Sequence, residues 1–421
     1  MTTTSPALSG IMRHLDAAVS PSHSVEYSAR RLIEDGFVAH SFEHLKDGLS
    51  PRGFIADAGL LLAWNRPGDS VDHFRIIGAH TDSPGLKIKP VPDTGALGWK
   101  QLGVEVYGGI LNNSWLDRDL GIAGRIVLRD GTVRSLRIDD AVARIPQLAV
   151  HLDREVNDRG LILDKQNHLT PVWGLGQSRN GEFVEFIAAR VDVPANEIIS
   201  WDLGLFDITP ASLLGSDRSL LTSGRLDNQV SCWAAVESLL AAPSEKIETA
   251  GTSVVALFDH EEVGSESTHG AAGPRLPWLL EALHGGTTVQ FHAALSRSHC
   301  VSADNAHAVH PNYPERHEPT HRPLPNLGPV LKVNANQRYA TSPESAAVFV
   351  RACEKVGVPH QVFVSKNSMP CGSTIGPITA TRLGIPTVDV GVAQLSMHSA
   401  RELCGALDPD LLARALSSYL V

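Results

Sequence analysis

The sequence predicts an α/β fold in which a β-rich module interrupts a domain built on a sheet with helices on its faces. From residue 226 onward, apolar strand-like runs alternate with helical patterns, which is typical of such a sheet. Between about residues 89 and 222, short alternating runs broken by turn residues replace the helical periodicity. We therefore expect residues 1–89 and 223–421 to form one domain and residues 90–222 to form an insertion.

The individual elements follow from local patterns of apolar residues. Amphipathic periodicity predicts helices, and apolar runs bounded by Gly, Pro and Asp predict strands. The expected helices are 7–18, 25–35, 228–241 and 343–355, and the expected strands are 59–64, 74–79, 252–258 and 388–392. Within the insertion, the alternating runs are VEVYGGI, GRIVLRDG and TVRSLRID.

Composition places the chain among ordinary globular proteins. Of its 421 residues, 43% are hydrophobic and 19% are charged, and the length suggests two or three domains. The formal charge of -10 argues against a nucleic-acid binder, which would need a basic stripe. No run of about 18 apolar residues predicts a membrane span.

The cysteines and the first residues of the chain indicate the cellular compartment. The five cysteines are odd in number and form no CxxC pair, which favours free thiols in a reducing compartment over disulfides or a cysteine zinc site. The first twenty residues, MTTTSPALSGIMRHLDAAVS, lack the basic region and apolar run of a signal peptide. We therefore expect a cytoplasmic protein.

A first candidate site is the motif Gly78-Ala79-His80-Thr81-Asp82, at the end of an expected strand. Ligands of open α/β sheets collect at the carboxyl ends of strands. His80 could therefore ligate a metal, with Asp82 tuning its orientation and basicity. The alternative is an ordinary histidine near an acid. His80 and Asp82 taken by themselves favour this alternative.

A second candidate is Asp259-His260-Glu261-Glu262, which follows the expected strand 252–258. Three carboxylates and a histidine in four residues are costly to bury unless they are paired or bind metal. A solvated acidic loop is the alternative. Gly264 occupies the position where a helical HExxH zinc motif would need its second histidine, so that motif is excluded here. Adjacent glutamates can divide the roles of general base and metal ligand.

Three further fragments contain Asp227, Asp304 and His398. Asp227 alone would be an ordinary helix N-cap, and a lone histidine in a chain with nineteen of them is poor support for a ligand. Taken together, the five fragments offer two His, two Asp and one Glu as ligands, plus a further Glu. A two-metal hydrolase site needs this set: a bridging carboxylate, a His and a carboxylate for each ion, and a free base.

These fragments carry a family resemblance. The sequence resembles the aspartyl aminopeptidase family, peptidase family M18, through blocks in the same order over nearly the whole chain. The blocks are HLDAAVSPSHSV, GAHTDSPGLKIKP, SGRLDNQ, DHEEVGS, SADNAHAVHPNYPERHEPTHRPLPNLGPVLKVNANQRYA, PCGSTIGPI and QLSMHSARE. The resemblance implies a phosphopeptidase-like α/β catalytic domain interrupted by a β-rich dimerisation domain, and a dodecamer assembled from dimers.

The resemblance also implies a metal site and its cofactor. Asp227 would bridge two divalent ions, zinc in the first place, with manganese or cobalt as alternatives. Each ion would have one histidine and one carboxylate of its own, His80 with Asp304 and His398 with Glu262. Glu261 would be the general base, and Asp82 would orient His80.

Four more residues are expected to serve the substrate. Lys332, in GPVLKVNANQRYA, would bind an acidic side chain, whereas without the resemblance a lysine snorkelling at a sheet edge would be preferred. Tyr339 and His307 are expected at the substrate as well. His168, in the insertion, reads from sequence alone as an ordinary loop histidine. The resemblance implies that it reaches the active site of a neighbouring subunit.

The expected function is therefore removal of N-terminal aspartate or glutamate from peptides by a dinuclear-metal aminopeptidase. One rival is a neutral or broad-specificity aminopeptidase or a deacylase on the same scaffold, which would lack a cation in the pocket for the first side chain. The other rival is a metal-binding scaffold protein without catalysis. Glu261 speaks against this rival, because a scaffold has no need of a base.

Overall fold

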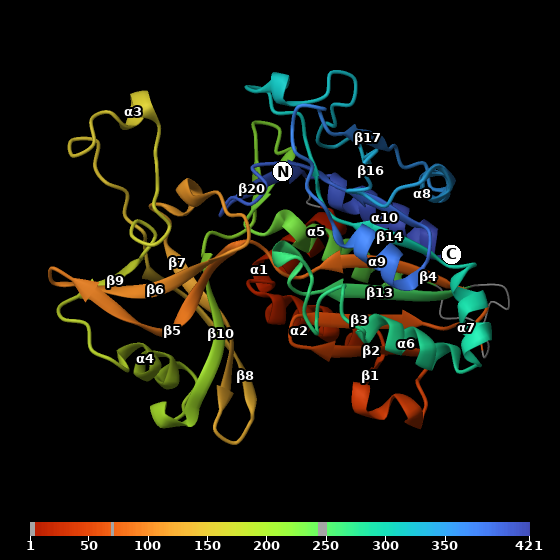
Figure 1. The fold of residues 1–421 in the computed structure, drawn as a ribbon, viewed down its shortest axis with the longest axis horizontal. Helices are drawn as coiled ribbons and strands as arrows, with labels where there is room; N and C mark the ends of the chain where they lie inside the picture. Colours follow the sequence, from red (N-terminus) through yellow and green to blue (C-terminus); the bar gives the residue numbers. More distant parts are fainter. Residues whose placement is uncertain (1–4, 69–70, 243–250) are drawn as a thin grey trace.

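The computed structural model describes residues 5–68, 71–242 and 251–421 of the chain. Within these residues the strands form three sheets, of nine, six and five strands. Figure 1 shows the nine-stranded sheet and its helices on one side of the molecule and the six-stranded sheet on the other. Residues 1–4, 69–70 and 243–250, which belong to the expected catalytic domain, lie outside the described part.

The nine-stranded sheet has the order β1-β2-β3-β13-β4-β14-β18-β16-β17. Its central strand β4 runs parallel to both β13 and β14, so the carboxyl ends of these three strands meet at one edge. The strands are β1 Val38–His40, β2 Arg52–Asp57, β3 Leu60–Asn65, β4 Phe74–His80, β13 Thr252–Phe258, β14 His299–Ala303, β16 Val330–Val333, β17 Gln361–Val364 and β18 Thr387–Gly391.

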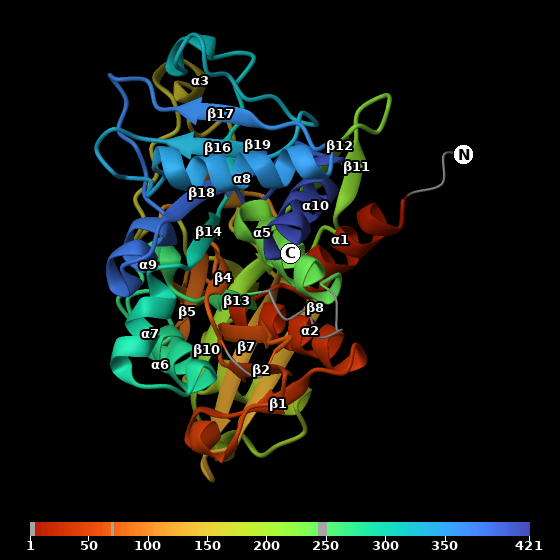
Figure 2. The same cartoon turned by 90° about the vertical axis from the view of Figure 1, so that its right-hand side faces the viewer.

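Helices cover both faces of this sheet. Successive strand side chains point to opposite faces: Val255 and Leu257 of β13 pack in one core cluster, and Val254 and Ala256 in the other. The first cluster contains residues of α1 Pro6–Ala17, α2 Pro21–Glu34, α5 Leu226–Leu240, α8 Pro343–Lys355 and α10 Asp408–Leu420. The second contains residues of α6 Arg275–His284, α7 Thr288–Leu295 and α9 Ile375–Leu383. Figure 2 shows the two helical layers on either side of β4 and β13.

Local capping explains where helix α2 begins. Ser20 caps α2 through its side chain, and Pro21 occupies the first turn, where its missing N–H costs nothing. The helix therefore begins four residues before the expected start at Val25. The predictions of 252–258 and 343–355 coincide with β13 and α8.

The six-stranded sheet is antiparallel, has the order β8-β7-β10-β5-β6-β9 and packs on its own apolar cluster. Its strands are β5 Gly85–Ala96, β6 Trp99–Tyr107, β7 Leu120–Leu128, β8 Val133–Ala143, β9 Val172–Leu175 and β10 Ile198–Asp207. Helix α4 Glu182–Arg190 contributes to the cluster, and the short α3 Val156–Arg159 lies on a projecting loop (Figure 1). Strand β5 runs across the expected boundary at residue 89. The role of this sheet in dimerisation stays a prediction.

A third sheet, which the sequence patterns did not indicate, connects the insertion to the catalytic part. Its order is β11-β12-β20-β19-β15. Its strands are β11 Ser212–Leu214, β12 Leu220–Ser223, β15 Ala306–His307, β19 Ala393–Leu395 and β20 Glu402–Gly405. Strands of two to four residues are too short to show an alternating pattern. Among the helices of the described residues, none has the length and apolar character needed to cross a membrane.

Candidate metal centre

The five residues expected to ligate metal lie around one cavity of about 410 Å³. Glu261, Lys332, Tyr339 and His307 line the same cavity. Residues from widely separated parts of the chain are thus brought together at the edge where the parallel strands end.

The strands explain why these side chains converge. His80 is the last residue of β4, Asp304 follows β14 directly, and Glu261 and Glu262 follow β13 after a short turn. His398, with φ of 67°, lies in the turn between β19 and β20. In an open α/β sheet this edge is where ligands bind.

Asp227 lies between the two histidines. Its Oδ1 is 3.4 Å from Nε2 of His80, and its Oδ2 is 3.6 Å from Nε2 of His398. Oδ1 is buried and accepts no hydrogen bond from the described residues. A buried carboxylate oxygen without a donor is costly, which fits an atom that binds a cation.

Two ligand triads share Asp227. One consists of His80, Asp227 and Asp304, the other of Asp227, Glu262 and His398, and within each the ligand atoms lie within 4.8 Å of one another. Nε2 of His80 is 3.6 Å from Oδ1 of Asp304, and Nε2 of His398 is 3.4 Å from Oε2 of Glu262. Imidazole nitrogens with carboxylate oxygens are suitable ligands for zinc. The residues therefore fit the ions that the sequence predicts.

Asp82 contacts both His80 and the acidic turn. Nδ1 of His80 is 3.0 Å from the backbone oxygen of Asp82 and 3.4 Å from its Oδ1, so the carbonyl is the closer partner. The carboxylate accepts the backbone N–H groups of Glu261 and Glu262, each at 3.1 Å. Asp82 thus joins the end of β4 to the turn after β13.

The ionisable groups that line the cavity change one another's pKa values. Burial raises the pKa of Glu261 to about 7, and burial together with Asp227 raises the pKa of Glu262. Although burial opposes it, contacts with Asp227 and Glu262 raise the pKa of His398 to about 10. The protein alone therefore leaves the clustered carboxylates poorly compensated, and bound cations would supply the missing positive charge.

Lys332 is buried in the cavity wall, with 2% of the residue exposed. Its Nζ is 3.3 Å from Oδ2 of Asp304 and 3.2 Å from the backbone oxygen of Asn305, and lies over the ring of Tyr339. Strand β16 lies between β18 and β17, so the alternative of a lysine snorkelling at a sheet edge is wrong. The ring of His307 packs at 5.9 Å from that of Phe363.

His168 is not brought to this cavity within the single chain. It is exposed on the loop before β9, where its Nδ1 accepts the N–H of Asp164 at 2.9 Å. An action on a neighbouring subunit stays a prediction.

Glu402 and Tyr107 contact the site but were given no role from the sequence. The carboxylate of Glu402 is buried and accepts the N–H groups of Asp227 at 2.9 Å and His398 at 2.7 Å. Burial raises the pKa of Glu402 to about 8. Tyr107 donates its hydroxyl to Oδ2 of Asp82 at 2.7 Å. The only sequence signal was the presence of Glu402 four residues after His398 in the block QLSMHSARE.

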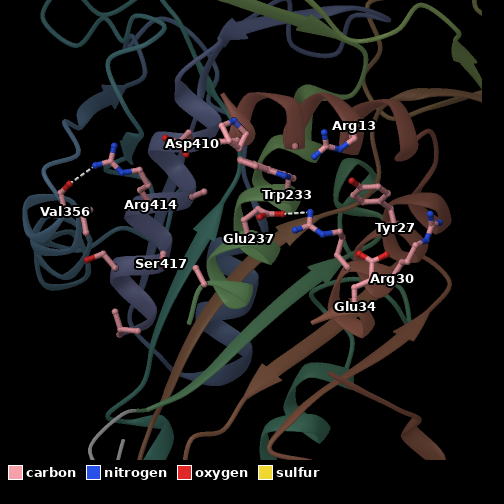
Figure 3. Close-up of a pocket in the computed structure, with 18 of the residues that line it drawn as sticks. Arg13, Tyr27, Arg30, Glu34, Trp233, Glu237, Val356, Asp410, Arg414 and Ser417 are labelled. Atoms are coloured by element: carbon pink, nitrogen blue, oxygen red, sulfur yellow. Dashed lines mark hydrogen bonds and ion pairs between the residues drawn. The ribbon is translucent and has the colours of Figure 1, made fainter. Parts of the chain in front are cut away.

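A second, larger cavity of about 800 Å³ has none of these residues in its lining. Figure 3 shows its floor on α5, at Trp233 and Glu237, between Arg414 of α10 and Tyr27 of α2. Arg31 pairs with Glu237 there at 2.7 Å. Size therefore does not identify the chemical site, because the buried carboxylates and histidines with perturbed pKa values line the smaller cavity.

Comparison with known proteins supplies further findings. Residues 14–419 match the family model described as aminopeptidase I zinc metalloprotease (M18). A protein of Streptomyces coelicolor named probable M18 family aminopeptidase 2 is 50% identical over 416 residues, covering 97% of this chain and 96% of the relative.

Solved structures agree with this match. A cryo-EM structure of an Ape4 and Nbr1 complex superposes with a TM-score of 0.94 at 32% identity, covering 98% of this chain and 85% of that one. The structure of the S. cerevisiae mApe1 dodecamer gives a TM-score of 0.84 at 27% identity, covering 98% and 96%. The expected fold class and family resemblance are confirmed by these likenesses.

Proposed function

The chain belongs to the M18 family of zinc aminopeptidases, and from this premise we propose that it removes aspartate or glutamate from the N-terminus of peptides with two bound divalent ions. The observation that carries the proposal is the position of Asp227, whose two oxygens face different histidines in two ligand triads. A single carboxylate shared in this way is suited to bridging two ions.

The proposed ligand roles follow the triads. His80 and Asp304 would hold one ion, and His398 and Glu262 would hold the other. Two such ions, when bound, would lower the pKa of a water at the site and polarise the scissile carbonyl. Zinc is the proposed metal, with manganese or cobalt as alternatives.

Glu261 is the proposed general base. Its carboxylate lines the cavity and lies near His80 and Glu262, but it belongs to neither of the two triads that share Asp227. It accepts a proton from the attacking water and passes it to the leaving amine. Burial raises the pKa of Glu261, and a base whose pKa lies near the operating pH can both accept and return a proton. This role favours an enzyme over a scaffold protein.

The free N-terminus of the substrate accounts for exopeptidase action. The free α-amine of the peptide would bind at one of the ions or at a carboxylate that holds them. An internal peptide bond offers no such amine. Removal of single N-terminal residues is therefore the favoured reaction.

Lys332 supports the preference for acidic residues. It is a cation in the wall of the cavity, flanked by Tyr339. Pairing with an aspartate or glutamate side chain in this buried setting would favour such substrates by about 1.5–3 kcal/mol. A neutral or broad-specificity aminopeptidase, or a deacylase, would have no use for this cation. These enzymes are therefore the second candidates.

Assembly into a homo-oligomer, a dodecamer built from dimers, is part of the proposal. The six-stranded module exposes large apolar side chains, with Leu97 98% and Ile162 84% accessible. Apolar side chains so exposed are suited to an interface with another copy. The mApe1 structure of similar fold is described as a dodecamer. His168 would act across such an interface.

A reducing compartment suits the thiols. All five cysteines are free, and Cys371 is the one that is not fully buried. We therefore place the enzyme in the cytoplasm, where thiols stay reduced.

One assay tests the proposed function. Purified protein is stripped of metal with a chelator, reloaded with zinc, manganese or cobalt, and given aspartyl, glutamyl, leucyl and N-acetylated aspartyl substrates. We expect metal-dependent release of aspartate and glutamate. Faster cleavage of leucyl substrates would favour a broad-specificity enzyme, and cleavage of the acetylated substrate alone would favour a deacylase.

A further inference from the structure

The end of strand β6 reaches from the six-stranded module into the metal centre. Five residues, Tyr107-Gly108-Gly109-Ile110-Leu111, follow one another there. We call residues 107–111 the bridging segment. Its contacts fall on residues proposed to hold the second ion and on the turn that carries Glu261.

The first contact concerns His398. Its Nδ1 donates to the backbone oxygen of Gly109 over 2.9 Å, and its backbone oxygen accepts the N–H of Leu111 at 3.0 Å. A hydrogen bond at Nδ1 fixes the proton on that nitrogen and leaves the lone pair of Nε2 for a metal. Nε2 is the nitrogen that faces Asp227 and Glu262.

The second contact concerns the acidic turn. Tyr107 donates to Oδ2 of Asp82 at 2.7 Å, and the same carboxylate receives the N–H groups of Glu261 and Glu262. The tyrosine hydroxyl thus fixes the acceptor that holds the turn. A polar network of this kind restrains its members most when every partner is present.

The third contact is steric. Gly108 has φ of +67°, and a Cβ built on it would lie 3.2 Å from Cβ of Glu262. The backbone of the bridging segment therefore passes against the proposed ligand at a distance that leaves little room for a side chain. Only a residue without Cβ adopts this conformation there at low cost.

We propose that the bridging segment, Tyr107–Leu111, is a positioning element that builds the half of the metal centre holding His398 and Glu262. The insertion is thereby part of the site's construction in the same subunit, in addition to any part it plays in assembly. This inference rests on the proposed function, because it concerns the ions proposed to bind there.

Two substitutions perturb the segment, and each has a matched control. Tyr107→Phe removes one hydroxyl hydrogen bond, and Tyr419→Phe removes another of 2.7 Å, to the backbone oxygen of His299, away from the site. Gly108→Ala adds a methyl group at positive φ beside Glu262. Gly131→Ala also adds a methyl group at positive φ, +85°, but nothing lies within 4 Å of the added Cβ.

The measurement is zinc content per subunit after dialysis against a graded series of chelator concentrations. We expect Tyr107→Phe and Gly108→Ala to lose the second equivalent of zinc at about tenfold lower chelator concentration than the wild type. The two controls should match the wild type. In reloaded Tyr107→Phe enzyme, kcat should fall with KM nearly unchanged, since Tyr107 is not among the residues that line the cavity.

The outcomes separate this inference from the proposed function. One outcome is that the wild type binds two zinc ions and cleaves aspartyl peptides while Tyr107→Phe and Gly108→Ala retain zinc as well as the wild type. In that case the positioning role is wrong and the proposed function stands. An equal loss in all four variants would also overturn the positioning role. A wild type that retains no zinc and cleaves nothing would overturn both.

Discussion

The backbone N–H of Glu261 donates to Oδ1 of Asp82 over 3.1 Å, although 179 positions separate the two residues. This bond joins the turn after β13 to the end of β4, two parallel neighbours of the central sheet. Because the turn is held at the sheet, the carboxylate of Glu261 has a defined position relative to His80. Catalysis by a general base depends on such positioning.

Replacement of Glu261 by glutamine should abolish turnover while leaving the metals bound. The change removes the proton acceptor, and Glu261 belongs to neither triad that shares Asp227. We therefore expect kcat to fall by about 10²–10⁴-fold, while elemental analysis finds an unchanged metal content. Glu266→Gln, in the same loop and exposed, serves as the control and should keep full activity. Near-wild-type turnover in metal-loaded Glu261→Gln enzyme would rule out this mechanism.

Replacement of either histidine proposed to ligate metal should instead lower the metal content. His80→Ala and His398→Ala each remove one ligand from one of the two triads that share Asp227, and elemental analysis should find less than the wild-type amount of metal per subunit. The exposed His44 offers a control, since it belongs to none of the groups of possible ligands among the described residues. Unchanged stoichiometry in both ligand variants would refute the assignment of the site.

Strongly patterned elements were predictable from the sequence, and so was the gathering of the candidate ligands at one site. Strand β13 is buried throughout and apolar from Val254 to Phe258 because both its faces are covered, and α8 combines a Ser342 cap, Pro343 and an amphipathic stripe. The ligand candidates could be picked out because buried carboxylates and histidines at strand ends are costly without a partner. The structure places all five around one cavity.

The remaining contacts depend on long-range geometry that no local pattern contains. Tyr107 ends a strand of alternating residues and looks like any other residue of that strand, yet it donates to Asp82. Glu402 holds the N–H of Asp227 from 175 positions away. The short strands β15 and β19 pair only because the chain returns to the same edge. Packing of separate segments creates these relationships.

Lys332→Leu should reduce cleavage of aspartyl peptides far more than cleavage of leucyl peptides. Loss of the charge pairing predicts a selective drop of roughly tenfold to one-hundredfold in kcat/KM for the aspartyl substrate. Because Nζ also lies 3.3 Å from Asp304, some loss on both substrates is expected, and the ratio of the two is the informative quantity. An equal loss on both would make Lys332 a structural residue.

Stability should fall on mild acidification because of His14. This residue is buried on α1 where the helix faces α5, with Nε2 3.0 Å from Oε1 of Gln229, and burial lowers its pKa to about 4. The unfolded chain, with an ordinary histidine pKa near 6.5, binds the proton more readily. The stabilisation is therefore complete above pH 6.5 and is lost between pH 6.5 and 4, by about 3 kcal/mol.

Denaturant unfolding at a series of pH values measures this effect. In His14→Gln the free energy of unfolding should depend less on pH over this window, whereas His44→Gln, at an exposed position, should keep the wild-type dependence. Identical pH profiles for wild type and His14→Gln would show that His14 does not carry the effect.

The last prediction concerns His168, which lies on the exposed loop before β9 and does not reach the cavity of its own chain. If the loop enters the active site of a neighbouring subunit, His168→Ala and Glu261→Gln each inactivate a homo-oligomer for a different reason. Mixing the two variants under conditions that allow subunit exchange should then restore activity. Each mixed dimer regains up to one working site, built from one subunit's Glu261 and its neighbour's His168. Exchange is verified with distinguishable tags on the two variants. Full activity of His168→Ala alone, or no recovery despite proven exchange, would exclude a shared site and leave His168 an ordinary loop residue.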